Sequence, residues 1–392
     1  MQIAMVGPFG LRPKGTMSVR ALPMARALVA RGHRVTLLLP PWQNPEDAGK
    51  RWNEGGVAIE NISLPPHVPG LFHALITLRL VRRTLALRPD VVHLFKPKAY
   101  SGLVHWVLAR LPHKRRPRLV VDADDWEGPG GWNEIGGYTP IQRRLFAWQE
   151  RWGLTHADAV TAASRTLESL VWAMGVTPRR VFYVPNGVEP RQLGERAPST
   201  QHSTILLYTR FFEFPVSRAI EVLRRVRQAM PEARLLVVGR GLFGEEEVLL
   251  AQAQEARLGE AVEYVGWVET ERLPEYFARA TLAMYPFDDT LVNRAKCAVK
   301  LGDLLAAGVP VVAEAVGQNR EYIRHGQTGW LVEPGDVDTF ARAIIHVLKN
   351  THLRQRLGQA AARDVRTRLA WERLVETVEL AYEATPHPLT PP

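Results

Sequence analysis

Cationic side chains stand at two places where an apolar run gives way to polar residues. Arg210 ends the run ILLYTR, and Lys296 and Lys300 stand four residues apart, on one face of a helix predicted to end at Gly308. Free backbone N–H groups at the start of a helix add positive potential. Arg210, Lys296 and Lys300 are therefore candidate binding residues at places of positive potential. For the two lysines, the alternative is a solvated helix face.

A glycine-containing loop, GPFGLRPKGTMS from Gly7 to Ser18, follows the first apolar strand. Its glycines are spaced wrongly for the G-x-G-x-x-G fingerprint, so the sequence argues against a dehydrogenase. Gly10 and Gly15 still permit close approach of the backbone to a ligand. Thr16 or Ser18 is predicted to cap a helix whose free N–H groups face a phosphate. The alternative is a purely structural turn.

Three carboxylates emerge where another apolar strand ends, in the segment VVDADDWEGPGGWN. Asp122 and Asp124 form a D-x-D pair with the oxygen ligands that a hard cation prefers. We expect instead that Asp124 or Asp125 contacts hydroxyl groups of a ligand, with capping of the loop as the alternative.

One histidine and two lysines follow a third strand, in the segment PDVVHLFKPKAYSG. His93 is a candidate catalytic residue, although a lone histidine at a strand end is more often a satisfied structural group. Lys96 and Lys98 suit an anionic ligand better.

Strands and helices that would position these residues alternate along the chain. In the first half, strand Ile3 to Val6, a helix from about Ser18 to Ala30 and strand Val35 to Leu39 form a βαβ unit. Further strands are predicted in this half at Val91 to Leu94, Leu119 to Asp122, Ala159 to Ala162 and Phe182 to Val184.

The second half repeats this alternation from Ile205 onward. Strands are predicted at Ile205 to Tyr208, Leu235 to Val238, Val262 to Val265, Leu282 to Tyr285, Val311 to Ala313 and Trp330 to Val332. Gly317 follows the strand Val311 to Ala313, and an α/β sheet binds its ligand outside such carboxyl ends. Helical patterns from about Val337 close the chain.

The length and composition predict two globular domains. At 392 residues the chain exceeds what one hydrophobic core usually supports. We predict a first domain at residues 1–190, a linker rich in proline and glycine at 191–202, a second domain at 203–365, and a final helix with a flexible tail at 366–392. No apolar run approaches the roughly 20 residues that span a bilayer, so we expect a cytoplasmic protein. The single cysteine, Cys297, excludes an internal disulfide and a cysteine-cluster metal site.

The run LLAAGVPVVA…VG…EYI…G.TGWLV.PGD resembles the donor-binding segment of family 4 glycosyltransferases, the group 1 glycosyltransferases, and the resemblance covers nearly the whole chain. It implies the GT-B fold, an α/β fold in which two Rossmann-like, doubly wound parallel-sheet domains face a central cleft. It also implies a retaining hexosyltransferase that moves a hexose from a nucleotide diphosphate sugar to an acceptor hydroxyl. Neither a metal ion nor a cofactor beyond this donor is implied.

The resemblance assigns roles on the donor side. Arg210 matches an arginine that grips the diphosphate, whereas the lysine expected five residues later is Pro215. Lys296 and Lys300 would then supply the missing positive charge, which the leaving diphosphate requires. Two glutamates of the family pattern are replaced by Ala295 and by Asp303, whose carboxylate can still accept hydrogen bonds from ribose.

Other segments match by position. His93 matches the first of two histidines at a strand end, and Phe95 replaces the second. Gly239, Gly241 and Gly266 resemble close backbone approaches to the nucleotide, with ordinary strand-end turns as the alternative. The loop that holds Gly10, Gly15 and Thr16 would border the diphosphate and sugar.

The net charge of +10 lies entirely in the half that would bind the acceptor. Residues 1–190 hold 25 basic and 14 acidic residues, whereas 191–392 hold 25 and 26. This excess suggests an anionic acceptor, or an anionic membrane surface with the protein peripheral to the inner membrane face. The stretch LFHALITLRLV beside Arg79, Arg82 and Arg83 would suit an interfacial helix. A solvated helix face is the alternative.

Two other functions remain open from the sequence. Ala295 and Pro215 are compatible with a GT-B protein that binds a nucleotide sugar without transferring it, and the fold also accommodates sugar-nucleotide epimerases. We expect no nucleic-acid partner, because the basic clusters lack interleaved stacking aromatics. A glycan or lipid-linked acceptor is the expected partner besides the donor.

Overall fold

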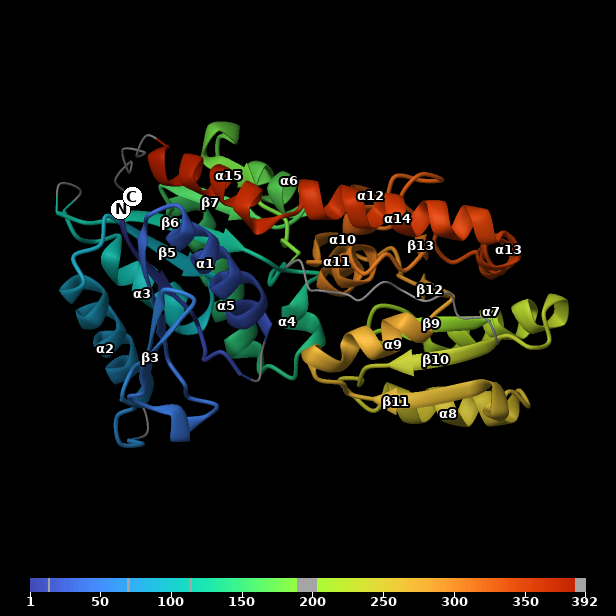
Figure 1. Ribbon diagram of the computed structural model, residues 1–392. Helices are drawn as coiled ribbons and strands as arrows, with labels where there is room; N and C mark the ends of the chain where they lie inside the picture. Colours follow the sequence, from blue (N-terminus) through green and yellow to red (C-terminus); the bar gives the residue numbers. More distant parts are fainter. Residues whose placement is uncertain (13–14, 69–70, 113–114, 189–202, 385–392) are drawn as a thin grey trace. The chain divides into compact units, whose positions relative to one another are not determined.

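The computed structural model describes residues 1–12, 15–68, 71–112, 115–188 and 203–384 (Figure 1). The chain divides into two compact units. Met1–Gly187, Ala295–Cys297 and Trp371–Pro392 form the first unit, and Val188–Arg294 with Ala298–Ala370 forms the second. The predicted linker at 191–202 and the predicted flexible tail lie outside the described residues.

The first unit is built on an eight-stranded sheet in the order β3-β4-β2-β1-β5-β6-β7-β8. Neighbouring strands are parallel, except that β3 and β4 form an antiparallel hairpin. The strands are β1 (Gln2–Val6), β2 (Arg34–Leu39), β3 (Arg51–Glu54), β4 (Val57–Asn61), β5 (Val91–Phe95), β6 (Arg118–Ala123), β7 (Ala159–Ala162) and β8 (Val181–Tyr183).

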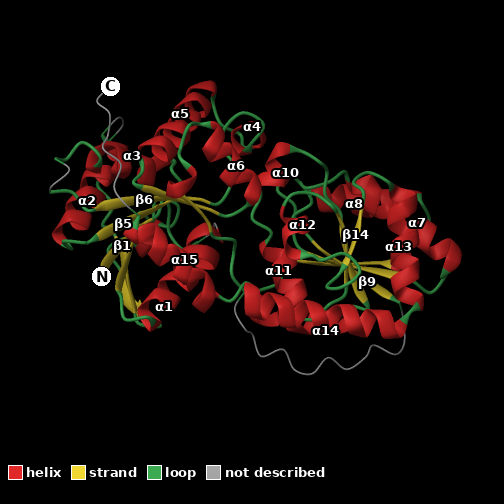
Figure 2. Cartoon of the chain, turned by 90° about the horizontal axis from the view of Figure 1, so that it is seen from above, coloured by secondary structure: helices red, strands yellow, loops and turns green. Residues whose placement is uncertain are grey.

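Helices cover both faces of this sheet (Figure 2), which is why β5 and β7 are buried along their whole length and are mostly apolar. The helical segments are a π-helix η1 (Thr16–Ala21), α1 (Leu22–Ala30), α2 (Phe72–Ala86), α3 (Ala99–Leu108), α4 (Trp132–Ile135), α5 (Pro140–His156), α6 (Arg165–Ala173), α15 (Trp371–Glu383) and the 3-10 turns η2 (Pro45–Asp47) and η3 (Pro178–Arg180).

The second unit is built on a six-stranded parallel sheet in the order β11-β10-β9-β12-β13-β14. Its strands are β9 (Thr204–Tyr208), β10 (Arg234–Val238), β11 (Val262–Gly266), β12 (Leu282–Tyr285), β13 (Val311–Glu314) and β14 (Trp330–Val332). Its helical segments are α7 (Val216–Ala229), α8 (Glu245–Glu255), η4 (Gly259–Ala261), η5 (Thr270–Arg272), α9 (Leu273–Arg279), α10 (Leu291–Ala295), α11 (Val299–Ala306), α12 (Gln318–Tyr322), α13 (Val337–Lys349) and α14 (Thr351–Arg368).

Each sheet reverses its winding direction at one place. In the first sheet the chain moves outward from β1 to β2 and then returns to β5 on the other side, and in the second β9 stands in the same way between β10 and β12. Loops on the two sides of such a switch point diverge and leave a crevice at the carboxyl ends of the strands. Two such ends, after β1 and β5 and after β9 and β12, are therefore the places to look for ligands.

The prediction of two doubly wound α/β sheets is confirmed, but one hairpin was missed and two local predictions are wrong. The hairpin β3–β4 was not predicted, because both strands are short and the first is polar. Neither Thr16 nor Ser18 caps the first helix, since Gly15 occupies the N-cap position and makes no side-chain cap. Lys296 and Lys300 do not share a helix, because α10 ends at Ala295 and α11 begins at Val299.

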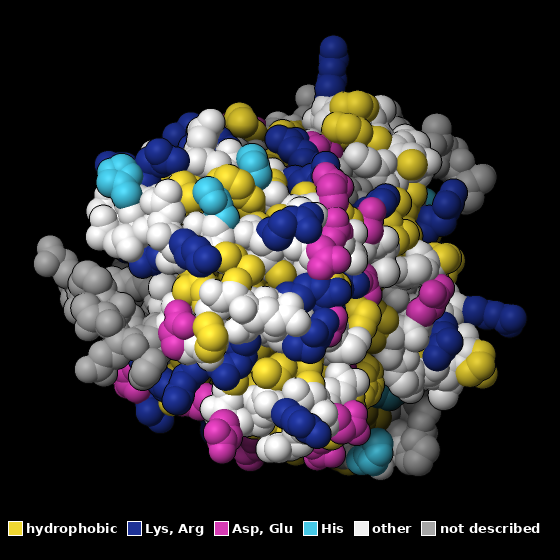
Figure 3. Space-filling view, turned by 90° about the vertical axis from the view of Figure 1, so that its right-hand side faces the viewer, with side chains coloured by type: hydrophobic (Ala, Val, Ile, Leu, Met, Phe, Trp, Pro, Cys, Tyr) yellow, Lys and Arg dark blue, Asp and Glu magenta, His cyan; other side chains and the backbone are white. Residues whose placement is uncertain are grey.

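Charge is mixed on the face seen in Figure 3, which looks at the right-hand side of Figure 1, where α7, α8 and α13 lie. Basic and acidic side chains alternate there, and Arg224 pairs with Glu221 while Arg225 pairs with Asp338. This pairing accords with the near-neutral charge of the second half. In the described part of the chain, no helix combines the length and the hydropathy needed to cross a bilayer.

Candidate functional site

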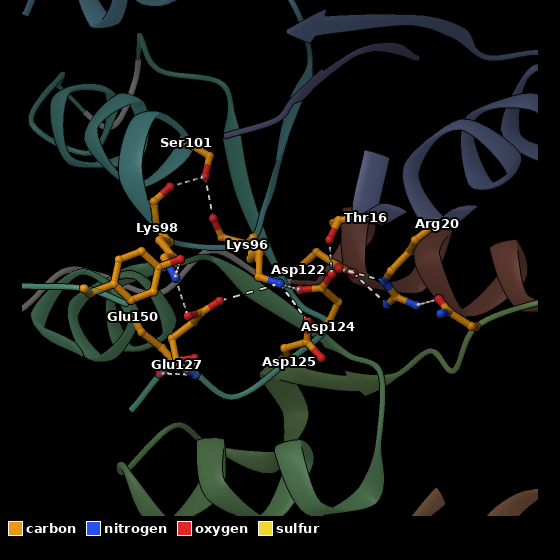
Figure 4. A network of polar contacts seen from close by, with 12 residues as sticks. Thr16, Arg20, Lys96, Lys98, Ser101, Asp122, Asp124, Asp125, Glu127 and Glu150 are labelled. Carbon is orange, nitrogen blue, oxygen red and sulfur yellow. Dashed lines mark hydrogen bonds and ion pairs between the residues drawn. The ribbon is translucent and has the colours of Figure 1, made fainter. Parts of the chain in front are cut away.

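A dense polar network lies at the carboxyl ends of β5 and β6 in the first unit (Figure 4). The Lys96 ammonium group lies 2.7 Å from Asp125 Oδ2, 3.6 Å from Asp124 Oδ1 and 3.5 Å from Glu127 Oε1. Burial alone would lower the pKa of Lys96, but the charges of these three carboxylates outweigh it and raise that pKa well above its usual value. Lys96 is therefore a fixed positive charge.

Lys98 is held in the same network. Its Nζ lies 2.5 Å from Glu127 Oε2, donates to the Tyr138 hydroxyl at 3.1 Å, and stands over the rings of Tyr138 and Phe146. The backbone N–H of Glu127 donates to both carboxyl oxygens of the buried Glu150. Burial, together with the charge of Glu127, raises the pKa of Glu150 well above its usual value.

The prediction that Lys96 and Lys98 meet an anionic ligand therefore needs correction. Both ammonium groups are already neutralised by carboxylates that follow the neighbouring strand β6. The carboxyl groups of Asp124, Asp125 and Glu127 surround the two ammonium groups. A ligand at this edge is better matched if it brings hydroxyl or N–H donors.

Asp122 and Asp124 have separate partners rather than a common one. Asp122 is fully buried and accepts two hydrogen bonds of 2.7 Å from the guanidinium group of Arg20. Asp124 accepts a hydrogen bond of 2.7 Å from the Thr16 hydroxyl, so it ties the glycine-containing loop to the end of β6. Among the described residues, no group of three or more His, Cys, Asp or Glu side chains is arranged to hold a metal ion.

His93 lies in the core, so the structural alternative for this residue holds. Its side chain is fully buried, with Nδ1 2.9 Å from the Tyr382 hydroxyl and Nε2 3.1 Å from Thr161 Oγ1. Burial, and to a lesser extent the positive charge of Arg20, lowers its pKa to about 3. A neutral, enclosed imidazole with both nitrogens engaged does not reach a substrate, and the predicted catalytic role is corrected on that ground.

In the second unit, Arg210 projects from a tight turn just after β9. The next residue, Phe211, is buried and adopts a positive φ of 70°, and its N–H donates to Thr209 Oγ1 at 2.8 Å. Such a backbone conformation costs on the order of 1–3 kcal/mol for a non-glycine residue and persists only where the surroundings hold it. Arg210 Nε is buried and has no hydrogen-bond partner within the described residues.

Lys300 lies in the first turn of α11, and its Nζ stands 3.6 Å from the centroid of the Tyr208 ring at the end of β9. Asp303 lies one turn further along the same half-buried helix. Lys296 lies in the break between α10 and α11. The structure thus brings Arg210 and Lys300 to the carboxyl end of one strand, β9.

Two of the predicted glycines have a structural reason within the protein. At Gly239, with a φ of 131°, a Cβ atom would collide with the carbonyl oxygen of Thr209. At Gly317, with a φ of 46°, it would collide with the backbone of Arg294. The other predicted glycines follow strand ends or border the first loop and are not crowded by the backbone in this way: Gly10, Gly15 and Gly266, with Gly241 facing Glu245 and Glu246.

Arg20 and Glu150 were not predicted as site residues, although the position of each in its helix pattern could have indicated them. Arg20 falls three residues after Met17 and four before Met24, on the otherwise apolar face of its helix, and is 1% exposed. Glu150 stands four residues before Leu154 on the buried face of α5. A charged residue at an apolar position of a periodic helix predicts a buried ion pair or a perturbed pKa.

Two of the positions at which this chain departs from the family pattern, Ala295 and Pro215, are structurally well defined. Ala295 is fully buried, and its carbonyl oxygen accepts a hydrogen bond of 3.0 Å from Ser164 Oγ. Pro215 is the N-cap residue of α7. A side chain larger than alanine would have to find room at a closely packed place.

Comparison with known families accounts for both units. Residues 15–187 match the family described as "Glycosyl transferase 4-like domain", and residues 197–364 match "Glycosyl transferases group 1". A phosphatidyl-myo-inositol mannosyltransferase of Mycobacterium leprae is 26% identical over 407 residues, which cover 98% of this chain and 96% of that protein.

Solved structures show the same fold. Sucrose-phosphate synthase from Thermosynechococcus elongatus superposes with a TM-score of 0.75 at 21% identity, over 97% of this chain and 98% of that one. Anabaena Alr3699/HepE, solved in complex with UDP and glucose, gives a TM-score of 0.73 at 17% identity, over 98% and 100% of the two chains. The α/β architecture predicted from the sequence is that of GT-B glycosyltransferases.

Proposed function

This chain belongs to the group 1 glycosyltransferases and has the GT-B fold, and from that premise we propose that it is a retaining hexosyltransferase. The donor is a nucleotide diphosphate sugar, and the acceptor is a hydroxyl group of a glycan or a lipid-linked glycan. The observation that carries this proposal is the succession of two family matches, one on each compact unit. A matching order of two domains is stronger support than the fold of either one.

The donor diphosphate is proposed to bind at the end of β9. Arg210 offers a buried Nε without a partner among the described residues, and an unsatisfied buried donor costs about 1–3 kcal/mol. A phosphate oxygen would satisfy it. Lys300 and the positive end of the α11 dipole add positive potential where the leaving diphosphate becomes more negative. Asp303 is proposed to accept hydrogen bonds from the ribose, with Gly239, Gly241, Gly266 and Gly317 of the same unit lining the nucleotide.

The acceptor is proposed to bind at the ends of β5 and β6. Asp124 and Asp125 have carboxyl oxygens that can accept hydrogen bonds from hydroxyl groups, and Thr16 fixes the adjoining loop against Asp124. In the reaction a departing phosphate oxygen takes the proton of the acceptor hydroxyl on the same face of the sugar, so no nucleophile from the protein is required. As the bond from the sugar to the phosphate oxygen breaks, the acceptor oxygen bonds to the same carbon from that face, and the part of the chain is to hold the acceptor there and to stabilise the leaving group.

Two further properties belong to this proposal. We infer that the protein works in the cytoplasm, peripheral to the inner membrane face, because the basic excess lies in the unit that would bind the acceptor. We also infer that it needs neither a metal ion nor a resident cofactor, because the fixed cations supply the charge that a metal would supply.

The buried Ala295 favours one second candidate, a protein that binds the nucleotide sugar and does not transfer it. Incubation with a panel of nucleotide sugars and glycan acceptors, followed by mass spectrometry, separates the possibilities. A product heavier by one hexose, with the anomeric configuration of the donor by NMR, supports retaining transfer. An isomerised donor indicates an epimerase, and binding without any turnover on the full panel refutes the proposed transferase.

A further inference from the structure

A stripe of large apolar side chains lies exposed along α5. Ile141, Leu145 and Trp148 are exposed by 80%, 43% and 44%, and their spacing of four and three residues puts them on one helix face. Trp152 continues the stripe by one more turn and is half-buried. Single exposed apolar residues need no explanation, but a contiguous row on one face marks an interaction surface.

Aromatic and cationic side chains extend this stripe toward the end of α3. The rings of Trp148 and Trp152 stack with their centroids 6.1 Å apart. The guanidinium group of Arg110 lies 3.5 Å from the centroid of the Trp106 ring and 5.8 Å from that of Trp152. Tryptophan and arginine in contact form a surface with an apolar body and a cationic edge, which suits the boundary between water and lipid.

The charges around the stripe have one sign. Arg144 and Arg151 are exposed on α5, and within the described residues no ion pair engages either of them. The only acidic residue of the helix, Glu150, is 1% exposed and faces the interior. The exposed charged side chains of α5 itself are therefore all positive.

The helix singled out from the sequence, α2, has a weaker case. It exposes Leu78 and Leu85, with Leu71 at its N-cap, but its arginines are partly engaged: Arg83 makes a bidentate ion pair with Glu60, and Arg79 donates to the carbonyl oxygen of Ser63. These contacts reduce the positive charge that α2 offers to a surface.

We propose that the α5 face, formed by Ile141, Leu145, Trp148, Arg144 and Arg151, docks this protein on an anionic lipid bilayer. This inference rests on the proposed function, in which the acceptor is lipid-linked, and it names the surface that brings the first unit to that acceptor. The apolar stripe enters the headgroup region, and the arginines meet lipid phosphates. A second copy of this chain is a poorer occupant, since a symmetric contact would bring like-charged arginines together.

Vesicle sedimentation of the full chain tests the proposal. The wild type is expected to pellet with vesicles that contain phosphatidylglycerol and to stay in solution with pure phosphatidylcholine, and its binding should weaken as salt is added. Changing Ile141→Gln with Leu145→Gln should abolish pelleting. Changing Arg144→Gln with Arg151→Gln should weaken binding by about 25-fold, at about five-fold per basic side chain, and should make it less sensitive to salt.

The matched control changes α2 instead, with Leu71→Gln and Leu78→Gln, and should pellet like the wild type. Loss of binding in that control, or unchanged binding in both α5 variants, would overturn the proposal, as would failure of the wild type to pellet. If size-exclusion chromatography shows that the α5 variants dissociate a dimer, the face is an interface between copies and the proposal is wrong. Circular dichroism checks the folding of every variant. If the variant with Ile141→Gln and Leu145→Gln does not fold, the variant with Arg144→Gln and Arg151→Gln decides the test.

A second assay measures nucleotide release from the donor with a water-soluble acceptor. It tests the transferase activity independently of binding to vesicles. An active enzyme that ignores both kinds of vesicle refutes the docking surface alone. A chain that binds vesicles through α5 but is inactive on every donor refutes the transferase alone.

Discussion

Acid should destabilise the first unit through His93. This imidazole is fully buried and its pKa is about 3, whereas the ordinary value is 6.5. Because the folded pKa lies below the unfolded one, the unfolded chain binds the extra proton between these values, and stability is lost as the pH falls below 6.5. From pH 7.5 to pH 5 the cost is about 2 kcal/mol for this one residue.

The variant His93→Gln cannot take up this proton, so its free energy of unfolding should fall by about 2 kcal/mol less than that of the wild type over the same interval. Urea unfolding followed by tryptophan fluorescence is suited to the measurement, because all of the 11 tryptophans except Trp267 and Trp330 lie in the first unit. His352→Gln, on an exposed helix position, is the control. Equal pH dependence in His93→Gln and wild type would show that His93 is protonated in the fold. A folded His93→Gln protein without transferase activity would restore His93 to the site.

Three further outcomes are expected. Arg210→Ala and Lys300→Ala should each lower kcat/KM by about 10- to 100-fold, since a charge-assisted hydrogen bond is worth roughly 1.5–3 kcal/mol, and near-wild-type rates of nucleotide release in both would remove them from the site. Activity should survive EDTA, whereas a loss that manganese restores would make the carboxylates after β6 metal ligands. Burial and the charge of Glu127 raise the pKa of Glu150 above its usual value of 4.5. The free energy of unfolding should therefore fall as the pH rises from 4.5 toward the raised pKa. Thermal unfolding of Glu150→Gln should therefore show a gain over wild type that grows with pH, and a constant difference would contradict the buried protonated carboxyl.

Sequence patterns were enough to locate the parallel strands, because a strand that is buried on both faces is mostly apolar. Strands such as Leu282–Tyr285 and Trp330–Val332 were located with their observed bounds. The hairpin of Arg51–Glu54 and Val57–Asn61 escaped, since its first strand, at the edge of the sheet, is polar and needs no apolar pattern. The start of α11 was misplaced because helical spacing alone does not reveal the break at residues 296–298.

The sequence predicted which strand ends carry the candidate site residues. It did not predict which of these side chains form ion pairs and hydrogen bonds with one another. Spacing placed Asp124 and Lys96 at carboxyl ends, yet no sequence rule says that the lysine would be used to neutralise the carboxylate. Their pairing depends on β5 and β6 being neighbours and in register, with Phe95 beside Asp122. Tertiary pairing of this kind decides whether a lysine can bind a ligand or instead forms an ion pair within the protein.

The position of α15 has a consequence for biosynthesis. Trp371, Val375 and Tyr382 pack into the core of the first unit beside Ile3 and Met5, which are separated from them by the entire second unit. A chain leaving the ribosome can therefore complete the second unit before the first. At about 5–20 residues per second, the roughly 200 residues after the last strand of the first sheet take on the order of 10–40 s to appear. During that interval the nascent first unit lacks one of its covering helices, and this surface is where a chaperone would be expected to bind.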